Sequence, residues 1–170
     1  SHLVVALAYD RLCTFEFGCV VELFALDRPE LGVDWYDFAV CAAERGPLRA
    51  AGGIEVRVPN SLALLDQAVT IVIPGWRNAD EIPAPALLRR IRAAYERGAR
   101  LCTICSGVFV LAAAGVLEGR TVTTHWRYAE RLTQRYPGVT VEPNSLYIDS
   151  GQVLTSAGSA AGLDMLLHLV

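Results

Sequence analysis

The chain of 170 residues contains no lysine, and all 15 of its basic residues are arginine. Asp and Glu together number 18, which gives a formal net charge of −3. Five arginines gather between residues 89 and 100, but the apolar residues among them recur with a helical period. This pattern favours a solvated helix face over a phosphate-binding stripe. Because binding to DNA needs several cations that converge on one groove, we expect any DNA contact to come from another domain.

Long apolar runs are also missing, although 53% of the residues are hydrophobic. No run approaches the ~20 apolar residues that a membrane-spanning helix needs, and the first residues lack the pattern of a secretory signal. We therefore expect no membrane contact and a cytoplasmic location. The apolar content is enough for the core of one domain over residues 1–170.

The five cysteines do not form the pattern of a metal site or a disulfide framework. Their number is odd, and the one C-x-x-C spacing, at Cys102 and Cys105, lies in an apolar segment. An unpaired set of this kind indicates a reducing compartment. The other candidate ligands are scattered singly, so we expect neither a metal nor a cofactor.

Short apolar segments alternate with amphipathic ones along the chain. Strand-like segments cover 3–8, 38–42, 54–58, 69–73, 100–104 and 121–124, and helix-like segments cover 15–26, 84–97, 108–116, 126–136 and 158–170. Two more segments, 146–148 and 153–155, flank a turn and indicate a hairpin. This alternation predicts a flavodoxin-like α/β fold, a three-layer sandwich in which helices cover both faces of a mostly parallel sheet.

The most informative segment is 100–107, where a buried strand leads directly into Cys105, Ser106 and Gly107 and then into a helix. Such a sharp turn lifts a nucleophile above the carboxyl edge of the sheet and needs small residues beside it. Unpaired N–H groups at a helix N-terminus also favour the thiolate. An isolated cysteine is more often a small buried hydrophobe, but this context favours a nucleophile elbow at Cys105.

Candidate backbone donors follow the strand expected beside the elbow strand. The N–H of Gly75, together with the N–H of Ser106, can form an oxyanion-type pair. Trp76 follows Gly75 and is expected to fill or roof the pocket. A plain tight turn at 74–76 is the alternative explanation.

Two titratable residues fall near the same edge. Glu16 is either a solvated acid in the first turn of a helix, stabilised by the helix dipole, or a buried partner of the Cys105 thiol. If Glu16 supports the thiolate, Glu16→Gln slows alkylation of Cys105. His125, followed by Trp126, is either a base or donor to a ligand, or a helix N-terminal residue without a catalytic role.

Six short strings in this order and spacing resemble the PfpI/ThiJ branch of the class I glutamine amidotransferase-like superfamily. They are FEFG at 15–18, IPGW at 73–76, ICSG at 104–107, GVLEG at 115–119, TTHWR at 123–127 and LTSAG at 154–158, with Asp164 beyond them. Within that branch the whole chain is similar to the amino-terminal domain of FtrA-type regulators of the AraC family. The resemblance implies a homodimer and a carboxy-terminal pair of helix-turn-helix units that bind DNA. Because the last residues form an apolar run without a helix-capping residue, we expect the chain to continue into that region.

The resemblance also assigns roles to individual positions. It makes Cys105 the elbow residue, Glu16 the carboxylate beside its sulfur, and Gly75 and Ser106 the oxyanion-type donors. His125 takes the place of a histidine that lies near the cysteine in several relatives.

Two positions depart from the pattern of the enzymes in this superfamily. Thr103 stands where amidotransferases have the first glycine of their elbow, and Trp76 stands where many relatives have a second glycine. Both departures disfavour hydrolase activity.

Three functions fit these residues, in the following order of preference. The first is a ligand-sensing regulatory domain that binds a small polar metabolite near Cys105, with Gly75, Trp76, Ser106, His125 and Trp126 as the candidate binding residues. The second is a cysteine-dependent enzyme such as an isonitrile hydratase-like hydro-lyase, in which Cys105 attacks an electrophilic carbon and Glu16 relays a proton. The third is a redox or carbonyl-stress sensor in which Cys105 is oxidised reversibly.

Overall fold

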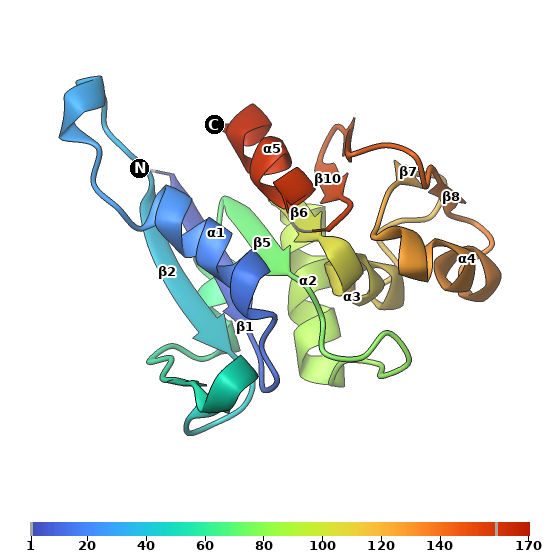
Figure 1. Ribbon diagram of the computed structural model, residues 1–170, viewed down its shortest axis with the longest axis horizontal. Helices are drawn as coiled ribbons and strands as arrows, with labels where there is room; N and C mark the ends of the chain where they lie inside the picture. Colours follow the sequence, from blue (N-terminus) through green and yellow to red (C-terminus); the bar gives the residue numbers. More distant parts are fainter. Residues whose placement is uncertain (1, 159) are drawn as a thin grey trace.

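The computed structural model describes residues 2–158 and 160–170. A six-stranded sheet forms the middle layer, in the order β2-β1-β5-β6-β10-β9 (Figure 1). The strands are β1 (Leu3–Ala8), β2 (Asp37–Ala42), β5 (Thr70–Pro74), β6 (Arg100–Ile104), β9 (Tyr147–Ser150) and β10 (Val153–Ser156). All neighbours pair in parallel except β9, which forms an antiparallel hairpin with β10. The predicted α/β fold and the hairpin are confirmed.

Helices cover both faces of this sheet. They are α1 (Thr14–Phe24) and α5 (Ala160–Leu169) on one face, and α2 (Pro85–Arg97) and α3 (Val108–Ala113) on the other (Figure 1). Because successive strand residues point to opposite faces, Val4 and Ala6 of β1 belong to the core under α1 and α5. Val5 and Leu7 belong to the core under α2 and α3. Most buried strand residues are apolar, as near-continuous hydrophobic strands require, and the buried polar exceptions are Thr70, Thr103, Thr155 and Ser156.

Shorter elements connect these layers. They are the 3-10 helices η1 (Pro29–Leu31), η2 (Ala51–Gly53), η3 (Leu62–Gln67) and η4 (Cys105–Gly107), the strands β3 (Leu48–Arg49), β4 (Glu55–Val56), β7 (Thr121–Val122) and β8 (Thr140–Val141), and the helix α4 (Trp126–Arg135). β4 pairs with β3, and β7 pairs with β8, in two small sheets beside the main one.

Three predicted elements are markedly shorter in the structure. The strand expected at 54–58 is reduced to β4, and the one expected at 121–124 is reduced to β7 because the N–H of Thr123 donates to the hydroxyl of Thr155. The helix expected at 108–116 ends at Ala113, and Gly115 then adopts a φ of 77°. Of the last helix, expected from 158, residue 159 lies outside the described residues.

The arginines of α2 lie on an exposed helix face, as predicted, and two of them also bind backbone carbonyls. Arg92 donates to the carbonyl of Ala114 at 2.6 Å. Arg97 donates to the carbonyls of Leu65 and Ala68 at 3.2 and 2.9 Å. These side chains hold the segments on either side of the helix.

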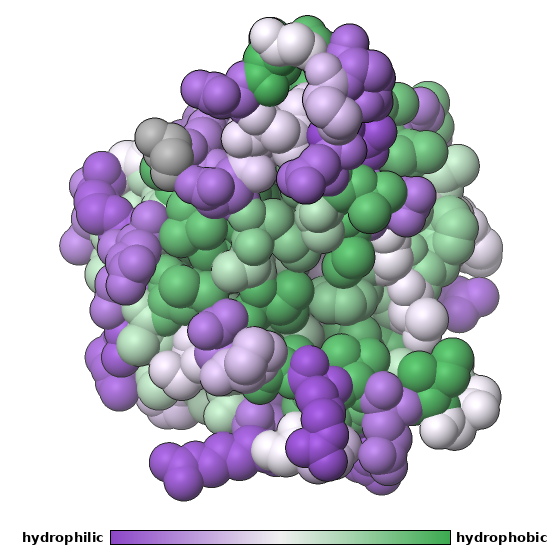
Figure 2. Space-filling view, turned by 90° about the vertical axis from the view of Figure 1, so that its left-hand side faces the viewer, coloured by the Kyte–Doolittle hydropathy of each residue, from purple (hydrophilic) through white to green (hydrophobic). Residues whose placement is uncertain are grey.

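The side of the molecule that carries the edge strand β2 has an apolar centre within a hydrophilic border (Figure 2). Phe38, Ala39 and Val40 of β2 are half-buried. The last part of this edge is paired, because Asn60 donates to the carbonyl of Val40 and accepts from the N–H of Ala42.

Among the described residues, no helix has the length and apolarity needed to cross a bilayer.

Tyr9, directly after β1, ties together two turns at the carboxyl edge of the sheet. Its hydroxyl donates to the carbonyl of Pro74 at 2.8 Å and accepts from the N–H of Cys13 at 3.3 Å. Its ring is 1% exposed, and its centroid lies 5.2 Å from that of Trp76. A single buried hydroxyl therefore joins the start of α1 to the end of β5.

Tyr9→Phe is expected to lower the free energy of unfolding by about 1–3 kcal/mol, because it leaves two buried backbone groups without a partner. Urea denaturation of wild type and variant measures this difference. Tyr136→Phe, at a half-buried position after α4, is the control and should change the free energy by less than about 0.5 kcal/mol. Equal denaturation midpoints for wild type and Tyr9→Phe would show that the hydroxyl does not join these turns.

Candidate functional site at the end of strand β6

Cys105 follows β6 in a strained conformation, with a φ of 55°. The left-handed region is unfavourable for a residue with a side chain. Two hydrogen bonds hold the backbone there. The N–H of Cys105 donates to the carbonyl of Ala157 at 3.1 Å, and its carbonyl accepts from the hydroxyl of Thr124 at 2.6 Å. The sharp strand-to-helix turn predicted from the sequence is present.

Ser106 fastens this turn to the turn that follows β5. Its hydroxyl accepts from the N–H of Trp76 and donates to the carbonyl of Trp76, both at 2.9 Å, and its side chain is 4% exposed. Gly107 lies so close to β5 that a Cβ there would be 2.3 Å from the carbonyl oxygen of Ile73. Because the obstructing atom belongs to the backbone, only glycine fits at position 107.

The candidate oxyanion-type donors are engaged within the protein. The N–H of Gly75 donates to the carbonyl of Ile73 at 3.0 Å, and that of Trp76 donates to Ser106. The N–H of Ser106 lies near the sulfur of Cys105 and lowers the pKa of its thiol, against the larger effect of burial. A ligand oxygen would therefore have to displace these acceptors before it could bind to Gly75 or Ser106.

The indole of Trp76 lies in the core on the far face of the sheet, which corrects its expected place over the pocket. It is 5% exposed and packs in the core under α2 and α3, whereas Cys105 packs against the core under α1 and α5. Its Nε1–H donates to the carbonyl of Glu81 at 2.9 Å, and the guanidinium of Arg77 lies 4.5 Å from the ring centroid. Only the backbone of Trp76 reaches the elbow.

The electrostatics of Cys105 differ from the expectation of a stabilised thiolate. Burial raises the pKa of its thiol to about 11, and the negative charge of Glu16 acts in the same direction. The hydrogen bond from the N–H of Ser106 lowers the pKa but is outweighed. Glu16 is therefore close enough to act on the sulfur through its charge, and here it opposes ionisation.

Cys13 also belongs to this site, although its sequence context alone predicts a small buried residue. Its sulfur lies where a side chain on Gly75 would begin, 2.7 Å from an added Cβ. Burial also raises the pKa of its thiol. Its position one residue before α1 was the available signal, because the first turns after parallel strands meet at one edge.

His125 and Cys105 flank Gly158. A Cβ on Gly158 would lie 2.7 Å from Cδ2 of His125 and 3.6 Å from the sulfur of Cys105. The Nδ1 of His125 accepts from the N–H of Arg127 at 3.1 Å at the start of α4, so Nε2 carries the proton when the ring is neutral. The imidazole thus caps a helix and also lies beside the site. Trp126 is 72% exposed, and its ring centroid lies 5.3 Å from that of His125.

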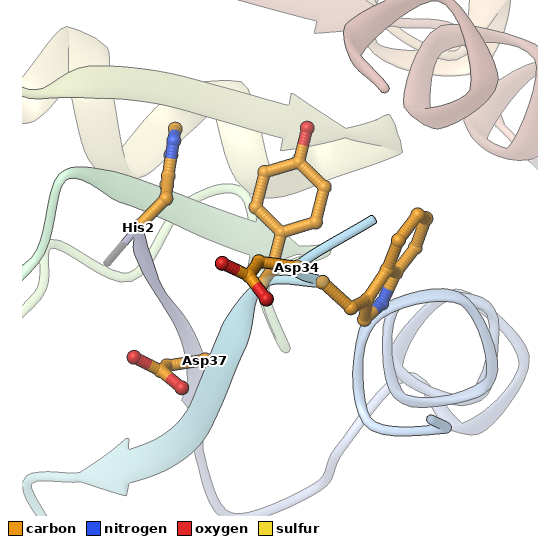
Figure 3. A pocket seen from close by; sticks show the side chains of 5 residues that line it. His2, Asp34 and Asp37 are labelled. Carbon is orange, nitrogen blue, oxygen red and sulfur yellow. The ribbon is translucent and has the colours of Figure 1, made fainter. Parts of the chain in front are cut away.

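A separate hollow lies at the opposite edge of the sheet from Cys105. Its volume is about 730 Å³, and it is lined by His2 and by residues 34–37, at the amino ends of β1 and β2 (Figure 3). The Nε2 of His2 lies 2.8 Å from the hydroxyl of Thr70, and burial lowers the pKa of the imidazole. Because ligands of open α/β sheets bind at the carboxyl edge, we assign this hollow no part in the elbow site.

Within residues 2–158 and 160–170, no group of three or more His, Cys, Asp or Glu is placed to hold a metal ion.

The fold is an open, mostly parallel α/β sheet, and a cysteine in a strained conformation forms the turn between one of its strands and the following helix. These two features define a doubly wound α/β protein with the turn geometry of a nucleophile elbow. The chain belongs to the DJ-1/PfpI family, whose model matches residues 5–170.

Its relatives include regulators of transcription. The HTH-type transcriptional regulator CdhR of Pseudomonas aeruginosa is 33% identical over 81% of this chain and 40% of its own length. The HTH-type transcriptional regulator GbdR of the same species is 34% identical over 96% of this chain and 44% of its own length. The chain thus spans about two fifths of these regulators.

An enzyme and a solved structure are also similar to this chain. Isonitrile hydratase of Pseudomonas putida is 26% identical over 72% of this chain and 53% of its own length. The crystal structure of an AraC family transcriptional regulator from Pseudomonas putida superposes with a TM-score of 0.84 at 21% identity, over 100% of this chain and 91% of that one. This last likeness shows the fold.

Alkylation of Cys105 by iodoacetamide is expected to be slow near pH 7 and to accelerate as pH rises beyond 9, because the thiolate is the nucleophile and the pKa is about 11. Glu16→Gln removes a negative charge, so it should lower this pKa and speed alkylation at pH 8. This sign is opposite to the one expected from the sequence. Mass spectrometry of the peptide that contains Cys105 gives the rate.

Glu22→Gln, an exposed position on the same helix, is the matched control and should leave the rate unchanged. A rate that already levels off below pH 8 would show that the Ser106 N–H outweighs burial. Slower labelling of Glu16→Gln would restore Glu16 as a support of the thiolate.

Proposed function

We propose that this domain is the ligand-sensing part of an AraC-type transcription regulator that works as a cytoplasmic homodimer and contacts DNA through another domain. The observation that carries this proposal is the match to HTH-type regulators at 33–34% identity, over 40–44% of their length. A segment of that relative size corresponds to one domain of a longer protein. The α2 arginines also favour DNA contact elsewhere, since Arg92 and Arg97 are engaged with backbone carbonyls.

The proposed ligand is a small polar metabolite held beside Cys105. Glu16 offers a carboxylate whose charge acts on the sulfur, His125 offers an imidazole near Gly158, and Trp126 offers an exposed ring beside His125. The N–H groups of Gly75 and Ser106 contribute where the ligand displaces their present acceptors.

The engaged donors support binding rather than hydrolysis. An oxyanion hole works because its donors are aimed at developing charge and need no rearrangement during the reaction. In this chain the N–H groups of Gly75 and Trp76 already have protein acceptors. A buried thiol whose pKa is about 11 is also a poor resting nucleophile near neutral pH.

A cysteine-dependent hydro-lyase is the second candidate, and the strained backbone of Cys105 is the observation that favours it. Strain of this kind concentrates at functional sites. Isonitrile hydratase is the corresponding relative, at 26% identity. A redox or carbonyl-stress sensor uses the same thiol and is distinguished by reversible oxidation without turnover.

The native reading frame beyond Val170 tests the regulator directly. We expect roughly a hundred further residues with two helix-turn-helix patterns, the size of one more domain. A stop codon within a turn or two of helix would contradict the regulator and make turnover of isonitriles the next assay.

Thermal-shift screening of small polar metabolites tests the ligand site. A ligand that binds the native state at 100 times its Kd stabilises it by about 2.7 kcal/mol. The shift should be lost in Cys105→Ala and in His125→Ala, and kept in the control His168→Ala, which alters an exposed histidine at the other end of α5. A shift that survives both site substitutions would place the ligand elsewhere.

A further inference from the structure

Cys13 places a second thiol against the turn that follows β5. Its sulfur lies 2.7 Å, and its Cβ 2.9 Å, from the position of an added Cβ on Gly75. On the elbow side, the backbone nitrogen of Gly75 lies 3.2 Å from an added Cβ on Gly107, which follows Cys105 and Ser106. Gly75 is therefore a residue that both cysteine-bearing turns contact.

Hydrogen bonds hold the backbone at both cysteines. The N–H of Cys13 donates to the hydroxyl of Tyr9 at 3.3 Å, and its carbonyl accepts from the N–H of Phe17 at 3.0 Å. The N–H of Cys105 donates to the carbonyl of Ala157 at 3.1 Å. Both side chains therefore project from held backbone, which keeps the two thiols at one site. Rotation about the Cα–Cβ bond moves either sulfur without breaking these hydrogen bonds.

The charges of the site also indicate that the two sulfurs are neighbours. A negative charge on Cys13 raises the pKa of the Cys105 thiol, and the charge of Glu16 raises the pKa of both thiols. Cys41 and Cys102 lie buried within strands β2 and β6, where burial raises the pKa of each thiol to about 12. Cys13 and Cys105 are only partly buried, so a small oxidant can reach them.

We propose that Cys13 and Cys105 form a reversible disulfide, in which Cys13 is the thiol that resolves an oxidised Cys105. The oxidant is a hydroperoxide. This proposal goes beyond the ligand-sensing function and does not depend on it, because the two thiols meet whether or not a metabolite binds beside them.

The chemistry takes two steps. In the first, the thiolate sulfur of Cys105 attacks one oxygen of the hydroperoxide, the O–O bond breaks, and water or an alcohol leaves as Cys105 becomes a sulfenic acid. In the second, the sulfur of Cys13 attacks the sulfur of Cys105 and the S–O bond breaks. The hydroxyl group then leaves as water with the proton of the Cys13 thiol. The two thiols together lose two electrons, and one hydroperoxide is reduced.

The electrostatics of the site favour a disulfide over further oxidation. A sulfinic acid carries a negative charge near neutral pH, and such a charge at Cys105 is opposed by burial and by Glu16. The N–H groups of Gly75 and Trp76, which could otherwise bind an anion, already have acceptors in the protein. A disulfide is neutral and needs no donor, so it avoids both costs.

The bond joins two segments that are far apart in the sequence. Cys13 directly precedes α1 and Cys105 directly follows β6, so the disulfide closes a loop that includes β2 and β5. Closing a long loop restricts the unfolded chain. The oxidised protein should therefore unfold at a higher urea concentration than the reduced protein.

Mass spectrometry of the 170-residue chain treated with hydrogen peroxide tests the pair. When the remaining thiols are alkylated after oxidation, we expect a product that has lost two hydrogens and is restored by dithiothreitol. Peptides cut after arginine carry Cys19 together with Cys13, and Cys102 together with Cys105. Fragmentation of the linked peptides should locate the bond at Cys13 and Cys105.

Cys13→Ser separates the two products of oxidation. Without the second thiol the sulfenic acid is not resolved, so Cys105 should gain two oxygens, and dithiothreitol should no longer restore it. Cys19→Ser alters a half-buried cysteine on α1 and is the matched control. It should form the disulfide as wild type does. Urea denaturation of the reduced variants establishes that each is folded before oxidation.

Three results would overturn the proposal. A wild type in which Cys105 stays a thiol or accumulates as a sulfinic acid would show that Cys13 does not resolve it. A disulfide that persists in Cys13→Ser would assign the bond to another cysteine. A linked product of twice the 18.4 kDa chain mass on a non-reducing gel would place the bond between two copies. The metabolite screen is carried out on reduced protein, so each of these results leaves the proposed function standing.

Discussion

The carboxyl edge of this sheet depends on the contact between two turns, one after β5 and one after β6. The hydroxyl of Ser106 both accepts from and donates to the backbone of Trp76. Gly107 brings α3 so close to Ile73 that no larger residue fits. Cys105 adopts its unfavourable φ of 55° because its neighbours on both sides are fixed in this way, and because Ala157 and Thr124 bind its backbone.

This constraint favours our proposal that the elbow binds a ligand and does not catalyse hydrolysis. The same hydrogen bonds that lock the turns occupy the N–H groups that an oxyanion would need, and the burial that results keeps the thiol protonated. What remains is a rigid site with a thiol, a carboxylate and an imidazole at the start of two helices. Such a site fits the proposed binding of a small ligand beside Cys105.

The sheet could be predicted closely because buried parallel strands are almost continuously apolar, and β1, β5 and β6 fall within a residue of their expected bounds. The elbow could be predicted because a strand is followed directly along the chain by Cys105 and by the small residues Ser106 and Gly107. The position of the Trp76 ring could not be predicted, since sequence periodicity gives the face of an element and not its neighbours in space. Cys13 could have been added to the site from its place directly before α1.

The central claim is that the backbone donors at the elbow are committed to the protein. Amide hydrogen exchange measured by NMR tests this directly at Gly75 and Trp76. The account predicts that both amides exchange as slowly as those of the core strands β5 and β6, because each has a buried acceptor. Rapid exchange at either residue would show a free donor at the site and would contradict the account in favour of a working oxyanion hole.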